Sequence, residues 1–201
     1  MSDAARQFSE PIVLRHGKRA LVRAIRPDDR ERLQTAFHAL EPESVYLRYF
    51  SYKAELTQAD LDRLCGPDFQ ERVVLVVTTD GHDGVGPESG GDSEVIIGSG
   101  GYVAHTAPDG KRAAEVAFAV EEDLHGEGIA SKLLAVLAGL ARADGIARFE
   151  AEVLVRNAPM LLVFAHSGLP MKQTHSDDGV VSVTMDLSLA DAPPSPAAAS
   201  R

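Results

Sequence analysis

The spacing of hydrophobic and polar positions predicts a strand, a tight turn and a helix in the second half of the chain. Residues 113–120 are small, β-branched or aromatic except for Glu115, which is typical of a buried strand with one polar position. From Gly128 onward, apolar residues recur at three- and four-residue intervals, which predicts a helix that ends near Gly145. A turn at residues 125–130 connects the two.

The same patterns assign the rest of the chain. Further strands are expected at 12–14, 20–25, 72–78, 94–105, 148–155, 169–174 and 180–187, and further helices at 27–40, after Pro42, at 57–64 and after Asn157. Antiparallel strands come first, a strand–helix–strand crossover follows, and a hairpin ends the chain. This order predicts an α/β (α+β mixed) fold, a mixed sheet with helices on both faces.

A chain of 201 residues suits one sizeable core. We expect a single domain over residues 11–189, preceded by a loose leader over 1–10 and followed by a disordered tail over 190–201. The glycine-rich segment near 80–93 cannot bury enough apolar surface to order itself, so it predicts a mobile loop.

Composition narrows the partners. A formal net charge of −10 argues against nonspecific nucleic-acid binding and suits a cationic partner such as a lysine side chain. No apolar run approaches the length of a membrane span, and a single cysteine excludes an internal disulfide, so we expect a cytoplasmic protein without a membrane partner. The sequence shows no ligand spacing of a metal site.

The turn His125-Gly126-Glu127-Gly128-Ile129-Ala130 is a candidate anion site. Small residues let a ligand approach the backbone, and the first amides of the helix, through Ser131, have no intrahelical partner. A diphosphate there would also meet the positive end of the helix dipole. Taken alone, the pattern fits a tight connection equally well, and it matches neither a P-loop nor the three-glycine dinucleotide fingerprint.

The turn resembles the coenzyme A pyrophosphate loop of the GCN5-related N-acetyltransferases (GNAT family), Arg/Gln-x-x-Gly-x-Gly/Ala. Gly128 and Ala130 fit its fourth and sixth positions, and His125 takes the place of the Arg or Gln. The segments IRPDD, ESVYLRYF, LTQADLDRL, AEVAFAV and AEVLVRNAPMLLVFAHSGL are similar to the acetyltransferase domain of bacterial protein lysine acetyltransferases, over residues 12–188.

This resemblance implies a mostly antiparallel sheet whose fourth and fifth strands splay apart, with acetyl-CoA in the opening and no metal. It implies main-chain contacts from Phe118 and Val120 to the thioester, and a contact from Asn157, which also fits a helix cap. The full set of implied coenzyme contacts is Phe118, Ala119, Val120, His125, Gly126, Glu127, Gly128, Ile129, Ala130, Ser131 and Asn157.

Glu115 is the candidate general base. At neutral pH only about one lysine amine in a thousand is deprotonated, so a positioned carboxylate assists the transfer. Strand alternation places Glu115 on the same side as Ala117 and Ala119, where small side chains leave room for a substrate. The resemblance implies that this glutamate is the base. The alternatives are a carboxylate that faces water or pairs with an arginine, and Glu152 as a weaker rival.

The expected function is transfer of an acetyl group from acetyl-CoA to a primary amine, with protein lysine side chains as the favoured acceptors. Two alternatives stay open: a small-amine acetyltransferase, and an acyl-CoA-binding regulatory or interaction module with little activity. No tyrosine acid is evident, because Phe164 and His166 occupy its expected region. The tyrosines between 46 and 52 either cover the core or line an acceptor groove.

Overall fold

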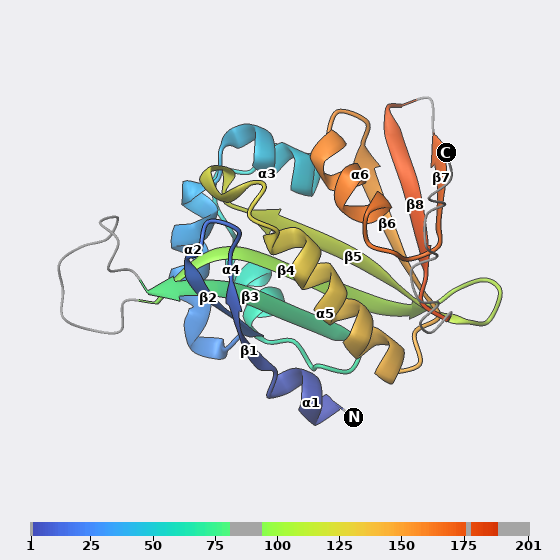
Figure 1. The fold of residues 1–201 in the computed structure, drawn as a ribbon, viewed down its shortest axis with the longest axis horizontal. Coiled ribbons are helices and arrows are strands. Elements are labelled where there is room, and N and C mark those ends of the chain that lie inside the picture. The colour runs from blue at the N-terminus through green and yellow to red at the C-terminus, as the bar shows by residue number, and fades with distance from the viewer. Residues whose placement is uncertain (1, 81–93, 176–177, 189–201) are drawn as a thin grey trace, which may run out of the picture.

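The computed structural model describes residues 2–80, 94–175 and 178–188 (Figure 1). The expected loop near 80–93, apart from Asp80, and the expected tail over 190–201 lie outside these ranges. The strands are β1 (Ser9–Val13), β2 (Arg19–Ala24), β3 (Arg72–Asp80), β4 (Glu94–Thr106), β5 (Arg112–Val120), β6 (Arg148–Leu154), β7 (Met171–His175) and β8 (Val180–Asp186). The helices are α1 (Ser2–Arg6), α2 (Arg30–Ala39), α3 (Pro42–Tyr49), α4 (Gln58–Cys65), α5 (Ile129–Ala143) and α6 (Ala158–Ala165), with 3-10 turns at Pro27–Asp29 and Glu122–Leu124.

The predicted strands and helices are confirmed, with ends that differ by a few residues. One expectation differs from the structure at the N-terminus. Residues 2–6 form α1 and β1 begins at Ser9, where the sequence predicted a loose leader. Ala5 is buried, so this helix packs on the domain.

A single eight-stranded sheet organises the fold, in the order β1-β2-β3-β4-β5-β6-β8-β7. Every neighbouring pair is antiparallel except β5 and β6, which are parallel. These two strands pair only from Ala113 with Arg148 to Glu115 with Glu150. Beyond that point they diverge, and Figure 1 shows them separating toward α3 and α6. The splay expected of the central strands is therefore present.

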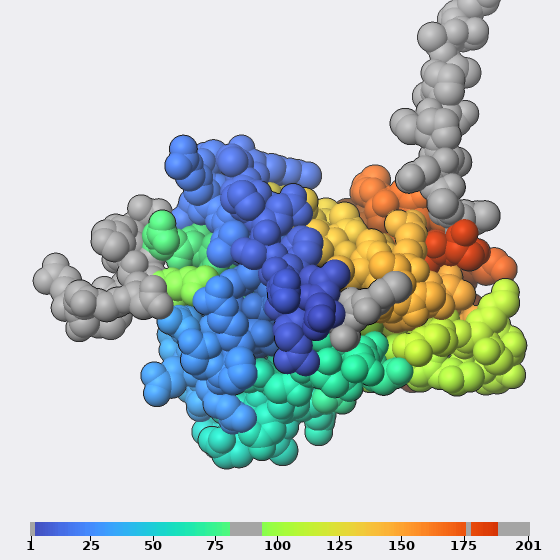
Figure 2. Space-filling view, turned by 90° about the horizontal axis from the view of Figure 1, so that it is seen from below, coloured from blue at the N-terminus to red at the C-terminus, as the bar shows by residue number. Residues whose placement is uncertain are grey.

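Helices cover both faces of the sheet. Helix α5 lies across one face over β3, β4 and β5, and α2 packs on β4 from the other (Figure 1). Gly100 of β4 allows close packing on the α5 side, because a Cβ there would lie 2.7 Å from the Phe118 ring and 3.4 Å from Leu133. In the space-filling view of Figure 2, the N-terminal segment lies beside the surface of α5.

A buried cluster of charged side chains connects β2 with the 3-10 turn that follows it and with β4. Arg23 of β2 is 1% exposed and donates to both carboxylate oxygens of Asp29, at 2.7 and 2.8 Å, and to Glu94 of β4. Burial acts to lower the pKa of the Arg23 guanidinium, but the hydrogen bonds to Asp29 and Glu94 outweigh it and raise that pKa. Every charge in the cluster has a partner, as buried charges require.

Local sequence signals fix the ends of two helices. The Thr57 side chain accepts from the Asp60 amide and the Asp60 carboxylate accepts from the Thr57 amide, so α4 begins with a complete capping box. The Asn157 side chain accepts from the Met160 amide at 3.2 Å and caps α6. None of the helices in the described ranges is both long and apolar enough to cross a bilayer.

Candidate active site

The splay between β5 and β6 opens into a pocket of about 470 Å³, called the β5–β6 pocket below. Its walls are residues 116–120 of β5, 151–153 of β6, the turn before α5, and the inner side of α6. Phe118 and Phe164 pack with their ring centroids 6.1 Å apart on its apolar side. This size falls in the range of pockets that hold small molecules and cofactors.

Unpaired main-chain groups of β5 face the opening. In a regular strand, the N–H and C=O of one residue point to one neighbouring strand and those of the next residue to the other. The Arg112 carbonyl accepts from Ala147, on the β6 side, and the β5 register with β4 is unbroken from Arg112 to Val120. The amides of Phe118 and Val120 therefore point toward β6, past the place where the pairing with β6 ends. They are positioned to donate to a ligand in the splay.

The glycine turn forms one end of the β5–β6 pocket. Gly126 and Gly128 have φ angles of 86° and 88°, which only glycine adopts at low cost. No side chain of the described residues caps α5, so the amides of Ile129, Ala130 and Ser131 are open to a ligand. The turn therefore has the open amides and the helix dipole that favour an anion, which are the features that the sequence predicted for this site.

Most of the predicted coenzyme contacts lie together around this pocket. The lining residues among them are Phe118, Ala119, Val120, His125, Gly126, Gly128, Ile129, Ala130, Ser131 and Asn157. The His125 ring bonds through Nε2 to the Val120 carbonyl at 3.0 Å, which leaves Nδ1 for any contact with phosphate. His166 and Phe164 line the pocket where the sequence offered no tyrosine acid.

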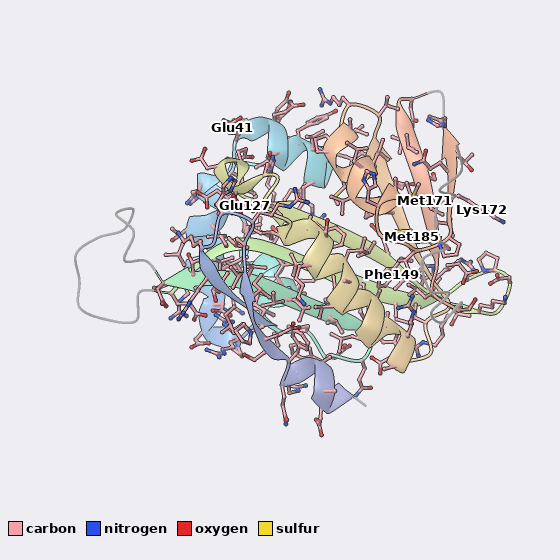
Figure 3. The ribbon with its side chains drawn as sticks, viewed as in Figure 1. Glu41, Glu127, Phe149, Met171, Lys172 and Met185 are labelled. Atoms are coloured by element: carbon pink, nitrogen blue, oxygen red, sulfur yellow. The ribbon has the colours of Figure 1, made fainter. Side chains whose placement is uncertain are left out.

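Glu127 is the exception, because its side chain turns away from the pocket. Its carboxylate accepts from the amides of Arg15 and His16 and pairs with the His16 ring, all in the turn between β1 and β2. Figure 3 labels Glu127 beside that turn. The contact with the His16 ring and the two amides lowers the pKa of the Glu127 carboxyl.

A second pocket, of about 490 Å³, lies on the opposite face of β5 and is called the α2–α4 pocket. Glu115, Ala117 and Ala119 line it from β5, which confirms the predicted shared side. Among the described residues, the exposed Glu115 carboxylate has no hydrogen bond or ion pair, so no arginine neutralises it. Glu152 lies instead in the β5–β6 pocket.

The two pockets adjoin at β5. Leu40, Arg48, Ala117 and Ala119 line both of them. Because the two alanine side chains are small, little separates a ligand in the splay from one beside Glu115. The site is therefore a two-sided cleft with a bare carboxylate on one side and open backbone amides on the other.

The sequence did not single out Glu121 as part of this site. Glu121 directly follows β5 and lines the α2–α4 pocket, and burial together with Asp123 and Glu122 raises the pKa of its carboxyl. The available signal was strand alternation, because Glu121 lies an even number of residues from Glu115. Tyr49 also lines this pocket, whereas the Tyr46 ring packs against the Tyr52 ring with the two planes tilted by 44°.

Within the described ranges, no group of three His, Cys, Asp or Glu side chains is arranged to hold a metal ion.

Comparison with known proteins identifies the class. The Acetyltransferase (GNAT) family model matches residues 38–169, and the chain belongs to this family of acetyltransferases. It is 30% identical over 186 residues to the acetyltransferase Pat of Mycolicibacterium smegmatis, a match that covers 92% of this chain and 50% of that protein. The chain thus spans about half the length of this curated relative.

Solved structures agree with this assignment. The GNAT domain of S. lividans PAT superimposes with a TM-score of 0.74 at 37% identity, covering 89% of this chain and 96% of that one. The cAMP-binding acyltransferase from Mycobacterium smegmatis gives a TM-score of 0.59 at 27% identity and covers 96% of this chain and 51% of that one. The yncA protein from Salmonella typhimurium, solved with its cofactor acetyl-CoA, shares the fold at 16% identity, with a TM-score of 0.61 over 89% of this chain and 99% of that one.

Proposed function

We propose that this protein transfers the acetyl group of acetyl-CoA to lysine side chains of proteins, with Glu115 as general base. The coenzyme would occupy the β5–β6 pocket and the amine would enter through the α2–α4 pocket. The observation that carries the proposal is the junction of the two pockets at Ala117 and Ala119 of β5. The unpaired Glu115 carboxylate lies two residues before Ala117 on the same strand.

Direct transfer of the acetyl group to an amine would need a general base and donors for the oxyanion, and this chain has candidates for both. Glu115 would take a proton from the amine, directly or through one water, so that the nitrogen attacks the thioester carbonyl. The Phe118 and Val120 amides would hold the oxygen that becomes negative when the carbon–nitrogen bond forms. The carbon–sulfur bond would then break, and a thiol whose reference pKa is about 8.5 would leave as thiolate without a tyrosine acid, while the nitrogen would lose its remaining extra proton to water.

The acceptor side favours a lysine that projects from a protein. Glu115 is exposed rather than enclosed, which suits a long side chain reaching in from a bulky partner. The formal charge of −10 favours approach of a cationic surface. The similarity to Pat over one half of that protein points to the same class of substrate.

A panel of acceptors tests the proposal. Purified protein with acetyl-CoA should release thiol in the presence of lysine-rich proteins, and mass spectrometry should locate acetyl groups on lysine side chains. Faster turnover on free polyamines than on any protein would favour the small-amine alternative. Tight acetyl-CoA binding without turnover on any amine would favour the binding module.

A further inference from the structure

The turn between β1 and β2 lies against the glycine turn, although 111 residues separate them in the chain. Glu127 accepts from the His16 amide at 3.1 Å, from the Arg15 amide, and pairs with the His16 ring. Figure 3 shows Glu127 at this junction. Its negative charge is therefore satisfied on the hairpin side, away from the pocket where phosphate would lie.

The neighbouring Arg15 points the other way. Its side chain lines the β5–β6 pocket together with Gly126, Gly128 and Ser131. The Nε atom lies 3.9 Å from the position that a Cβ on Gly128 would occupy. Among the described residues, the Arg15 guanidinium has no hydrogen bond or ion pair partner. A free guanidinium fork beside open helix amides matches the geometry of a phosphate group.

The pyrophosphate loop itself lacks a strong cation. His125 stands where the family pattern has Arg or Gln, and its Nε2 is engaged with the Val120 carbonyl. Arg15 can supply a positive charge at this place from another segment, because it lines this end of the pocket beside Gly128.

We propose that Arg15 binds the diphosphate of the coenzyme and that Glu127 is a positioning residue that holds the β1–β2 turn where Arg15 can do so. This inference rests on the proposed use of acetyl-CoA. It assigns the acid of the glycine turn a supporting part: Glu127 orders the backbone that carries the arginine, and the hairpin becomes one wall of the coenzyme site.

Calorimetric titration of acetyl-CoA tests the role of Arg15. The Arg15→Ala variant should bind about tenfold more weakly than wild type, as expected for loss of a hydrogen bond between charged groups. Arg19→Ala is the matched control, because it removes the same charge from β2 at a residue outside the pocket. The affinity of wild type should fall more steeply with added salt than that of Arg15→Ala. Equal affinities of the two variants would overturn the inference.

Titrations with CoA and with 3′-dephospho-CoA identify which phosphate group of the coenzyme Arg15 contacts. With 3′-dephospho-CoA, which keeps the diphosphate, Arg15→Ala should show the same fold loss as with CoA. A loss that disappears with this ligand would place Arg15 on the 3′-phosphate and overturn the assignment. If wild type binds neither ligand, the proposed function fails as well, so the two failures are distinguishable.

A double-mutant cycle tests the role of Glu127. Glu127→Gln should weaken acetyl-CoA binding several-fold in the wild-type background and have no further effect in Arg15→Ala. Additive losses would show that Glu127 acts independently of Arg15. Thermal unfolding of each variant establishes that the domain remains folded.

Discussion

The two sides of β5 are built by different means. The β5–β6 pocket presents backbone: the amides of Phe118 and Val120, two left-handed glycines and the first turn of α5. The α2–α4 pocket presents side chains from helices and strands far apart in the chain, with an unpaired carboxylate at Glu115. Backbone donors are fixed by the fold and cost no reorganisation, which suits the binding of a constant ligand. Side chains set the charge that an acceptor meets.

The sharpest way to separate the two sides is Glu115→Gln. We expect the transfer rate to fall by about 10²–10⁴-fold, because the base is lost and the shape is kept. Initial rates of thiol release measure this. Glu152→Gln is the control, since this carboxylate lies in the other pocket and should cost much less. If the Glu152 variant loses more activity than the Glu115 variant, the base has been assigned to the wrong strand.

The next largest effect is expected on the backbone side. Gly128→Val places a β-branched residue at a φ of 88° and should weaken acetyl-CoA binding by about ten- to a hundredfold, because the turn must rearrange. Gly110→Val, at a φ of 77° in the turn before β5, imposes similar strain outside the pocket. It should lose stability and keep its affinity for the coenzyme. Calorimetry measures the affinity of both variants for acetyl-CoA, and thermal unfolding measures their stability. Together they distinguish general backbone strain from a change in the coenzyme site.

A smaller effect is expected from the helix that borders the acceptor side. Asp60 completes the capping box of α4, pairs with Lys53 and lines the α2–α4 pocket. Asp60→Ala should lower the unfolding free energy by about 1 kcal/mol and leave coenzyme affinity unchanged. Denaturant unfolding measures the first quantity. Asp62→Ala, on the same helix but outside the pocket lining, should cost less.

The Asp60 effect should depend on pH. Burial acts to raise the pKa of this carboxyl, but Lys53 and Thr57 outweigh it and lower that pKa to about 2. A depressed acid pKa contributes stability above the unfolded-state value of about 3.9, and that stability is lost as the pH falls toward 2. The gap between wild type and Asp60→Ala should therefore close below about pH 4. A constant gap down to pH 2 would contradict this account of Asp60.

The smallest effect on the reaction is expected at Glu121, and among the kinetic constants it should change only the KM for the acceptor. Glu121→Gln should raise the KM for a lysine acceptor by about three- to fivefold, as for a partly exposed charge pair, with no change in the KM for acetyl-CoA.

Because burial and the acids nearby raise the pKa of Glu121, folded stability falls as the pH rises through that pKa. The variant should then melt at or above the wild-type temperature at pH 7. A lower melting temperature of the variant would contradict the inference that the charged Glu121 carboxylate destabilises the folded protein at pH 7.

The features that the sequence predicted are the local ones. The strand with Glu115, the glycine turn at Gly128 and the Thr57 cap each depend on residues a few positions apart, and each is present in the structure. The splay of β5 from β6 followed from the family resemblance rather than from spacing.

The features that the sequence missed are contacts between distant segments. Glu94 of β4 pairs with Arg23 of β2, 71 residues away in the chain, in the cluster that also buries Asp29. Arg15 is not part of any recognisable sequence motif. The register of β1 with β2 and the hydrogen bonds of Glu127 to the turn between these strands place it beside Gly128. Glu127 was expected among the coenzyme contacts, because the sequence does not show that its carboxylate pairs with His16.

The most direct test of the two-sided site is a calorimetric titration of acetyl-CoA into wild type and Glu115→Gln, run in parallel. We expect equal dissociation constants, because Glu115 lies in the α2–α4 pocket and outside the lining of the β5–β6 pocket. A tenfold or larger loss of affinity in the variant would place Glu115 in the coenzyme site and contradict the separation of the two sides.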